Sequence, residues 1–175
     1  MRVPVRISQL SRDVRDGCFL LAPHAGTDSA SATLLELLNS SRAVIPFFPR
    51  NDSNVVLLTR AHLEWVAVDL EVAPHLIRAN ARRVTREQRV ELRFLDNRHV
   101  EGIVQWDARE DTLRLSDYLN GPDDFFVINT PSGAMIANRS RIVETRLAEV
   151  SPRPAQIQAL RDLEEMPFKS PSPPA

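Results

Sequence analysis

The chain has 175 residues, of which 43% are hydrophobic and 26% charged, a balance typical of a globular protein with one ordinary domain or two very small ones. Its 22 basic and 23 acidic residues leave a net charge of −1, so no global positive field favours nucleic acid or anionic lipid as a partner. A membrane-spanning helix is not expected because no apolar stretch approaches the roughly 18 residues it needs. A single cysteine, Cys18, excludes an internal disulfide, and the N-terminus lacks the apolar core of a secretory signal, so we expect a cytoplasmic protein.

The first 70 residues predict five strands and one short helix. Val3, Val5 and Ile7 alternate with polar neighbours, which is the period of two expected of a half-buried strand. A second strand follows a turn at 11–13, and a helical turn over 33–39 is capped by Ser31 or Thr33 and closed by Asn39. Three more strands are expected, at 43–48, 55–59 and 63–68.

Residues 71–87 are expected to form a helical linker. Pro74 is suited to a helix start, and apolar residues follow at roughly helical spacing: Leu76, Ile77, Ala81 and Val84. At the other end of the chain, the composition predicts a helix over 150–166 and a disordered Pro/Ser tail over 167–175.

Residues 88–149 predict the same succession of elements as the first 70. Val90, Leu92 and Phe94 alternate with charged residues as in a half-buried strand. Asp117 is expected to accept a hydrogen bond at the start of the helical turn over 114–120, together with Ser116, and Asn120-Gly121 to end it in the left-handed conformation. The other strands are expected at 102–106, 124–129, 134–137 and 142–147.

These parallels indicate an internal duplication. Residues 33–39 (TLLELLN) align with 114–120 (RLSDYLN) at a spacing of 81, and Val44 aligns with Phe125 at the same spacing. Asp16-Gly17 aligns with Glu101-Gly102 at 85, and Leu57 with Ile136 at 79. Chance matching of apolar residues is the alternative. We therefore expect a mainly β protein with two tandem copies, 3–70 and 88–149, each a strongly bent five-stranded sheet or small barrel, Sm-like or similar, with one short helical turn.

Two details of this repeat carry structural expectations. A glycine recurs at the same strand position, Gly17 and Gly102, which predicts a bulge or a close approach of neighbouring backbone. The strands 44–48 and 125–128 are apolar at consecutive positions, so both are expected to be buried on two faces, where one copy packs on the other.

The usual signatures of metal, nucleotide and catalytic sites are missing. The four histidines and Cys18 lack the spacing of metal ligands, and no glycine-rich phosphate loop or nucleophile motif occurs, so we expect no cofactor. Carboxylates are more frequent in the second copy, where solvated turn residues explain them more simply than a catalytic pair. They are Asp107, Glu110, Asp111, Asp123 and Asp124. The chain is therefore not expected to be an enzyme.

Two ligand-binding alternatives rest on arginines. Arg82-x-x-x-Arg86 ahead of a strand resembles the first half of the cyclic-dinucleotide motif of the PilZ domain, whose arginines bind phosphate. The second half of that motif departs here, because the segment at 114–119 (RLSDYL) has neither the expected acid nor the glycine. Small barrels also bind nucleic acid, with arginines along the phosphates and aromatic side chains on the bases, but aromatic residues are few.

The segment 114–120 with Phe125-Phe126 resembles an uncharacterised family of small bacterial domains, in which an Arg-Leu-Ser-Asp-x-Leu-Asn block precedes a Phe-rich strand. The resemblance covers 88–147 and implies a bacterial origin and a small β fold, but no activity. Arg114, Asp117 and Asn120 are then candidate contact residues, beside a purely structural role in the turn.

We expect a non-catalytic interaction or regulatory module that binds another protein, with homo-oligomers as an open alternative. Residues 75–99 carry a net charge of +4 and residues 100–124 a net charge of −5, and such segregation steers charged partners. The preferred contact region is therefore the second copy with the arginine-rich linker. Its candidate residues are Arg82, Arg86, Arg89, Arg114, Asp117 and Asn120.

Overall fold

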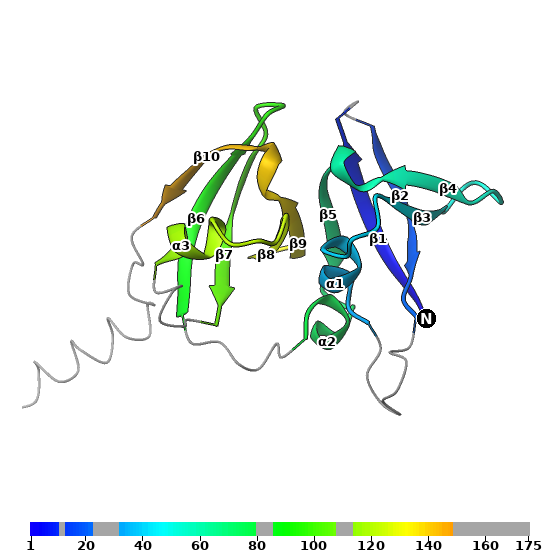
Figure 1. Cartoon of the computed structure of the whole chain (residues 1–175), viewed down its shortest axis with the longest axis horizontal. Helices are drawn as coiled ribbons and strands as arrows, with labels where there is room; N and C mark the ends of the chain where they lie inside the picture. Colours follow the sequence, from blue (N-terminus) through cyan, green and yellow to red (C-terminus); the bar gives the residue numbers. More distant parts are fainter. Residues whose placement is uncertain (11–12, 23–31, 80–85, 108–113, 149–175) are drawn as a thin grey trace, which may run out of the picture.

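A computed structural model describes residues 1–10, 13–22, 32–79, 86–107 and 114–148 of the chain (Figure 1). The fold is mainly β, as predicted. The strands are β1 (Arg2–Gln9), β2 (Val14–Leu20), β3 (Val44–Pro49), β4 (Val56–Thr59), β5 (Leu63–Asp69), β6 (Arg86–Phe94), β7 (His99–Trp106), β8 (Phe125–Thr130), β9 (Gly133–Asn138) and β10 (Ile142–Leu147). The short helices are α1 (Leu34–Leu38), α2 (Pro74–Ile77) and α3 (Leu115–Leu119), with single 3-10 turns at Arg60–His62 and Arg139–Arg141.

All ten strands belong to one antiparallel sheet in the order β10-β6-β7-β8-β9-β5-β1-β2-β3-β4. The sequence predicts two separate five-stranded sheets, whereas the structure joins them because β5 pairs with β9. The sheet does not close, and β10 and β4 lie at its two ends. Figure 1 shows the strands of residues 1–70 and those of residues 86–148 side by side, each group bent around its own interior.

Within the two halves, the strands follow the same order and the same register. The first half reads β5-β1-β2-β3-β4 and the second reads β10-β6-β7-β8-β9. Val5 lies opposite Gly17, just as Val90 lies opposite Gly102. The irregularity of register between β1 and β5 also recurs between β6 and β10. The spacings of 85, 81 and 79 residues found in the sequence therefore carry strand pairs of the first half onto strand pairs of the second.

The two glycines stand where a neighbouring strand comes very close. A Cβ added at Gly17 would lie 2.4 Å from the Phe48 carbonyl oxygen, and one at Gly102 would lie 2.6 Å from that of Asn129. The pairing with the preceding strand runs through both positions without a shift, so the expected bulge is absent. The close backbone approach is the part of the prediction that holds.

The first core lies inside the first half but takes side chains from both halves. Apolar residues of β1 to β5 and of α1 fill it, and Val72 and Ile77 close it from the segment after β5. The second half contributes Phe125, Val127 and Ile136 to this core. In return, Trp65 of β5 lies in the second core, under the guanidinium of Arg98, which is 4.9 Å from the ring centroid.

β8 is buried on both faces, as the run of apolar residues predicts. Its alternate residues enter different cores, with Phe125 and Val127 in the first and Phe126 and Ile128 in the second. The same prediction is wrong for β3, in which Val44 is exposed. The reason is the position in the sheet: β8 lies next to the junction between the halves, whereas only the edge strand β4 lies beyond β3.

The ends of the helices correct two further expectations. Thr33 caps α1 as predicted, accepting a hydrogen bond from the Glu36 amide at 3.2 Å. Asn120 ends α3 with φ near −88°, and the described residues with positive φ are Asn97 and Gly133, so the left-handed ending at Asn120-Gly121 is wrong. Instead, the amides of Asn120 and Gly121 close the last turn on the carbonyls of Ser116 and Tyr118.

The linker helix is shorter than predicted. α2 starts at Pro74, as expected, but ends after one turn because Arg78 adopts an extended conformation. The Arg78 guanidinium then donates to the Gln105 carbonyl of the second half at 2.8 Å. Ala81 and Val84 lie outside the described residues, as do the predicted helix at 150–166 and the tail at 167–175.

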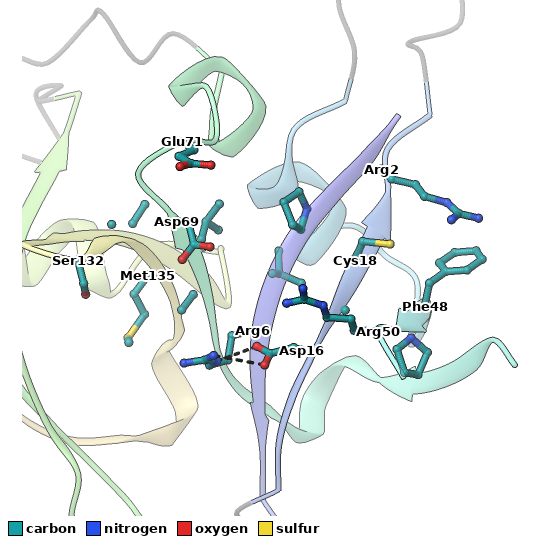
Figure 2. Close-up of a pocket in the computed structure, with 18 of the residues that line it drawn as sticks. Arg2, Arg6, Asp16, Cys18, Phe48, Arg50, Asp69, Glu71, Ser132 and Met135 are labelled. Carbon is teal, nitrogen blue, oxygen red and sulfur yellow. Dashed lines mark hydrogen bonds and ion pairs between the residues drawn. The ribbon is translucent and has the colours of Figure 1, made fainter. Parts of the chain in front are cut away.

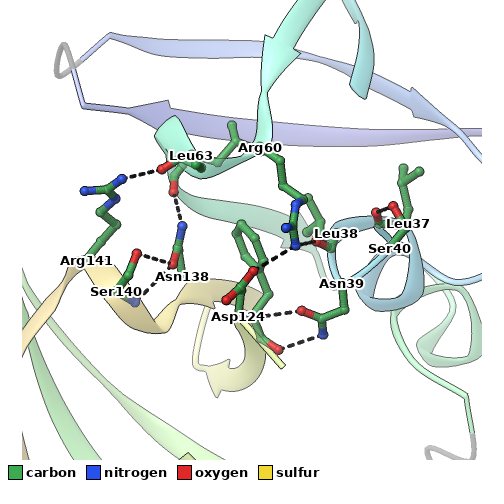
Figure 3. A network of polar contacts seen from close by, with 12 residues as sticks. Leu37, Leu38, Asn39, Ser40, Arg60, Leu63, Asp124, Asn138, Ser140 and Arg141 are labelled. Carbon is green, nitrogen blue, oxygen red and sulfur yellow. Dashed lines mark hydrogen bonds and ion pairs between the residues drawn. The ribbon is translucent and has the colours of Figure 1, made fainter. Parts of the chain in front are cut away.

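A polar network joins the halves at the start of β8 (Figure 3). The Asn39 side chain donates to the Phe125 carbonyl and accepts from the Phe125 amide, both at 2.9 Å. Arg60 donates to the Leu38 carbonyl at 3.0 Å and forms an ion pair with Asp124 at 2.9 Å. Farther along, Asn138 donates to the buried Leu63 carbonyl at 2.8 Å. These bonds satisfy backbone groups where regular strand pairing stops.

Candidate interaction surface

A groove of about 770 Å³ opens on the second half, and we call it the α3 groove. Trp106 and Leu115 are buried beneath it, and the exposed side chain of Leu147 stands at its edge. The full lining comes from β6, β7, α3 and β10: Arg86, Glu87, Gln88, Trp106, Arg114, Leu115, Ser116, Leu119, Thr145 and Leu147. One wall is thus the edge strand β10, whose outer side has no partner strand among the described residues.

The equivalent surface of the first half is filled. At the repeat spacings, Trp106, Leu115 and Leu147 correspond to Leu21, Leu34 and Val68, which are all buried in the first core. Strands β8 and β9 cover that place, since β9 pairs with β5 and Phe125 and Ile136 enter the core. The α3 groove is therefore the position at which the second half lacks what β8 and β9 give to the first.

The structure brings some of the predicted contact residues to this groove. Arg86, at the start of β6, and Arg114, just before α3, both line it although 28 residues separate them in the chain. Arg89 lies on the other face of β6, exposed and within 3.4 Å of Glu101, so it does not reach the groove. Arg82 lies outside the described residues.

Asp117 and Asn120 flank α3 in different roles. A carboxylate oxygen of Asp117 accepts a hydrogen bond from the Arg114 amide at 3.0 Å, which fixes the first turn. Asn120 is exposed, and its side chain has no hydrogen bond to another described residue. Its equivalent in the first half, Asn39, instead forms the paired bonds with Phe125.

An exposed apolar stripe on the first half complements the groove in character. Val44, Val55 and Leu57 lie on one face of the hairpin that ends the sheet, because Val44 is opposite Thr59 and Leu57 is opposite Pro46. We call these three residues the β4 stripe. Their equivalents in the second half, Phe125, Ala134 and Ile136, pack in or against the first core.

The outward face of β10 is charged. Glu144 accepts hydrogen bonds from Arg93 at 2.9 Å and from Arg146 at 2.7 Å. These arginines, Arg146 first, lower the pKa of Glu144 below its ordinary value. The carboxylate therefore stays ionised at neutral pH and is suited to an ion-pair network, not to proton transfer.

A second pocket of about 870 Å³ lies on the open face of β1, β2, β5 and β9 (Figure 2). Arg6 and Asp16 face each other across it at 2.7 Å, and the hydrogen bond from Arg6 lowers the pKa of Asp16. Asp69 and Glu71 lie on the opposite side of the view from Arg50. Charges of both signs are dispersed over the pocket, and its carboxylates do not converge as general acid-base catalysis requires.

Other expectations concern the scattered candidates. Among the described residues, no three His, Cys, Asp or Glu side chains gather as metal ligands would. Of the carboxylates in the second half, Asp124 forms the ion pair with Arg60, and Glu110 and Asp111 lie outside the described part of the chain. No described helix has the length and apolar character that crossing a membrane demands.

Sequence reasoning missed the apolar part of the surface. Leu147, Thr145 and the β4 stripe look like ordinary strand residues when each half is considered alone. The signal was present in the repeat, since Val44 aligns with Phe125, and Leu57 aligns with Ile136. Neither a protein-family model, nor a curated protein, nor a solved structure matches the chain.

Proposed function

We propose that this chain is a non-catalytic assembly module, built from two copies of one small bent β unit, that binds another protein at the α3 groove and along the edge of β10. The observation that carries the proposal is the filled equivalent of this surface. In the first half, two strands from elsewhere in the chain cover the same place. The fold therefore already contains one example of the contact.

The mode of binding is addition of a strand to the sheet. β10 offers backbone donors and acceptors along its outer side, and an incoming strand gains affinity from these groups. Specificity comes from alternate side chains, which meet Thr145 and Leu147 on the groove side. Arg86 and Arg114 stand at the same groove and favour a polar or acidic residue in the partner.

The shared register of the two halves supports the tandem-repeat part of the proposal. A one-residue slip in any strand would reverse its buried face, so agreement across β1·β2, β2·β3, β3·β4 and β1·β5 is a demanding match. The same pairs recur in β6·β7, β7·β8, β8·β9 and β6·β10. Independent origins of such agreement are hard to reconcile with these fixed spacings.

Capture of a partner with the purified full chain as bait tests the proposal. Leu147→Glu places a charge at the edge of the groove and should abolish capture, whereas the matched Leu70→Glu, at an equally exposed apolar residue after β5, should not. A bait lacking residues 151–175 tests whether the tail takes part. Equal capture by all of these baits would contradict the assignment of the surface.

Arg86 and Arg114 also support a second candidate, a phosphate-bearing ligand such as a cyclic dinucleotide or a nucleic acid. A salt series separates the two. Nucleic-acid binding that weakens steeply between low and moderate salt, and that the double variant Arg86→Ala/Arg114→Ala abolishes, would favour the second candidate. Protein capture at the apolar groove is expected to change little over the same range.

A further inference from the structure

We propose that the strand bound by β10 is β4 of a second copy of this chain, so that molecules assemble head to tail through the two ends of the ten-stranded sheet. This inference rests on the proposed function and names its partner. The internal junction pairs the fourth strand of the second half, β9, with the fifth strand of the first, β5. The strands left at the ends are the remaining fourth and fifth strands, β4 and β10.

The internal junction fixes the register of the external one. Val66 lies opposite Ile136, and Val68 lies opposite Ala134. The 79-residue spacing converts these pairs into Thr145 opposite Leu57 and Leu147 opposite Val55. The β4 stripe of one molecule would then lie on the groove side of β10 in the next, against the residues that line the α3 groove.

Burial differs at equivalent positions in the way that this contact requires. Phe125 and Ile136 are 1% and 0% exposed, because they enter the first core. Val44 and Leu57, their equivalents, are 44% and 70% exposed. An apolar stripe on one end of the sheet and an apolar groove at the other end are complementary surfaces that one molecule cannot bring together.

A polar contact is also left open at the corresponding place. Asn39 binds both backbone groups of Phe125 across the internal junction. Asn120 occupies the equivalent position on α3 and is exposed. In the assembly, its amide would bind the backbone of Val44 in the next molecule. This gives Asn120, a candidate from the sequence, a contact role that does not alter the fold of one molecule.

The opposite face explains why β10 carries charge where β5 carries Trp65. Trp65 fills space in the second core beside Val104, Ile128 and Ala137. The first core has larger side chains at the equivalent positions, Phe19, Phe47 and Leu58, and all three are buried within it. It has no comparable space to be filled from a neighbour. Glu144 and Arg146 of β10, equivalent to Trp65 and Ala67, can therefore stay in their ion-pair network at the rim.

The proposed contact joins two different surfaces, so it is heterologous. A head-to-tail dimer keeps one unpaired β4 and one unpaired β10, and growth continues until a ring closes or a filament forms. A symmetric dimer would instead pair like with like, β4 with β4 or β10 with β10. This difference gives a decisive mixing experiment.

The experiment uses the full chain and two variants in sedimentation velocity. Leu57→Arg blocks the β4 end and Leu147→Arg blocks the β10 end. Each variant alone should associate at least about 10-fold more weakly than the unaltered chain, since each loses burial of a leucine. Their equimolar mixture should form a 1:1 dimer that grows no further, through the intact β10 of the first and the intact β4 of the second. Leu70→Arg, at an equally exposed residue away from both ends, should assemble normally.

Cross-linking tests the register in a Cys18→Ser background. Val55→Cys mixed with Leu147→Cys should give an intermolecular product with a short thiol cross-linker, because directly opposite residues have Cβ atoms about 5 Å apart. Leu20→Cys, as exposed as Val55 but on the interior strand β2, should give none with Leu147→Cys.

A purified chain that stays monomeric at every concentration, with no dimer in the mixture, would overturn the inference. If Leu147-dependent capture of a different protein persisted, the proposed function would still stand. Loss of both would overturn the proposed function as well. A dimer that Leu57→Arg leaves intact would also count against the head-to-tail contact.

Discussion

Asn39→Ala should destabilise the chain strongly, although the residue lies at the end of a five-residue helix. Its side chain closes two hydrogen bonds of 2.9 Å with the amide and carbonyl of Phe125, a residue that is almost fully buried. Alanine leaves both backbone groups unpaired, and each costs about 1–3 kcal/mol. With some access of water to this partly buried site, we expect a loss of about 2–4 kcal/mol in the free energy of unfolding.

Asn120→Ala is the matched control because it makes the same change at the equivalent position of the second half. Its side chain is exposed and bonds to no other described residue, so the loss should stay within about 0.5 kcal/mol. Guanidinium unfolding followed by circular dichroism, in dilute solution, measures both variants. In thermal unfolding, the difference corresponds to about 5–12 °C. Equal losses for the two variants would refute the reasoning that Asn39 joins the halves.

Three further outcomes test other parts of the account. Trp65→Ala should lose about 3–5 kcal/mol of stability in chemical unfolding, since it empties part of the second core from a strand of the first half, and a loss below about 1 kcal/mol would contradict the sharing of cores. Gly102→Ala should destabilise the fold by about 1–3 kcal/mol, because its Cβ would collide with the Asn129 carbonyl, whereas Gly121→Ala, where the nearest atom is 3.1 Å away, should cost less. In a carboxyl NMR titration, Glu144 should titrate below the ordinary value and Arg146→Ala should raise its pKa; the pair's contribution is present above the unfolded pKa and is lost as pH falls through the folded one.

Much of the local structure could be predicted because it depends on neighbours in the sequence. Strict alternation around Val90 and Leu92 specifies a half-buried strand, and Thr33 followed three residues later by Glu36 specifies a helix start. Ile142–Leu147 was predicted to the residue. These features require no knowledge of which strand lies alongside.

The junction between the halves could not be predicted in the same way. An apolar run shows that a strand is buried, but it does not name the surface that buries it. Val44 and Phe125 have the same surroundings in sequence, and only the pairing of β5 with β9 makes one exposed and the other buried. Likewise, Leu147 and Leu57 become recognisable as contact residues only when their equivalents Val68 and Ile136 are seen in the first core.

Amide hydrogen exchange at increasing chain concentration tests the central claim most directly, because it observes the two end strands themselves. The account predicts that protection in β4 and β10 rises together with concentration, while that of the interior strand β2 does not change. Leu57→Arg should remove the gain in both end strands. Protection in β4 and β10 that stays constant from dilute to concentrated solution, or that rises in only one of them, would contradict the account.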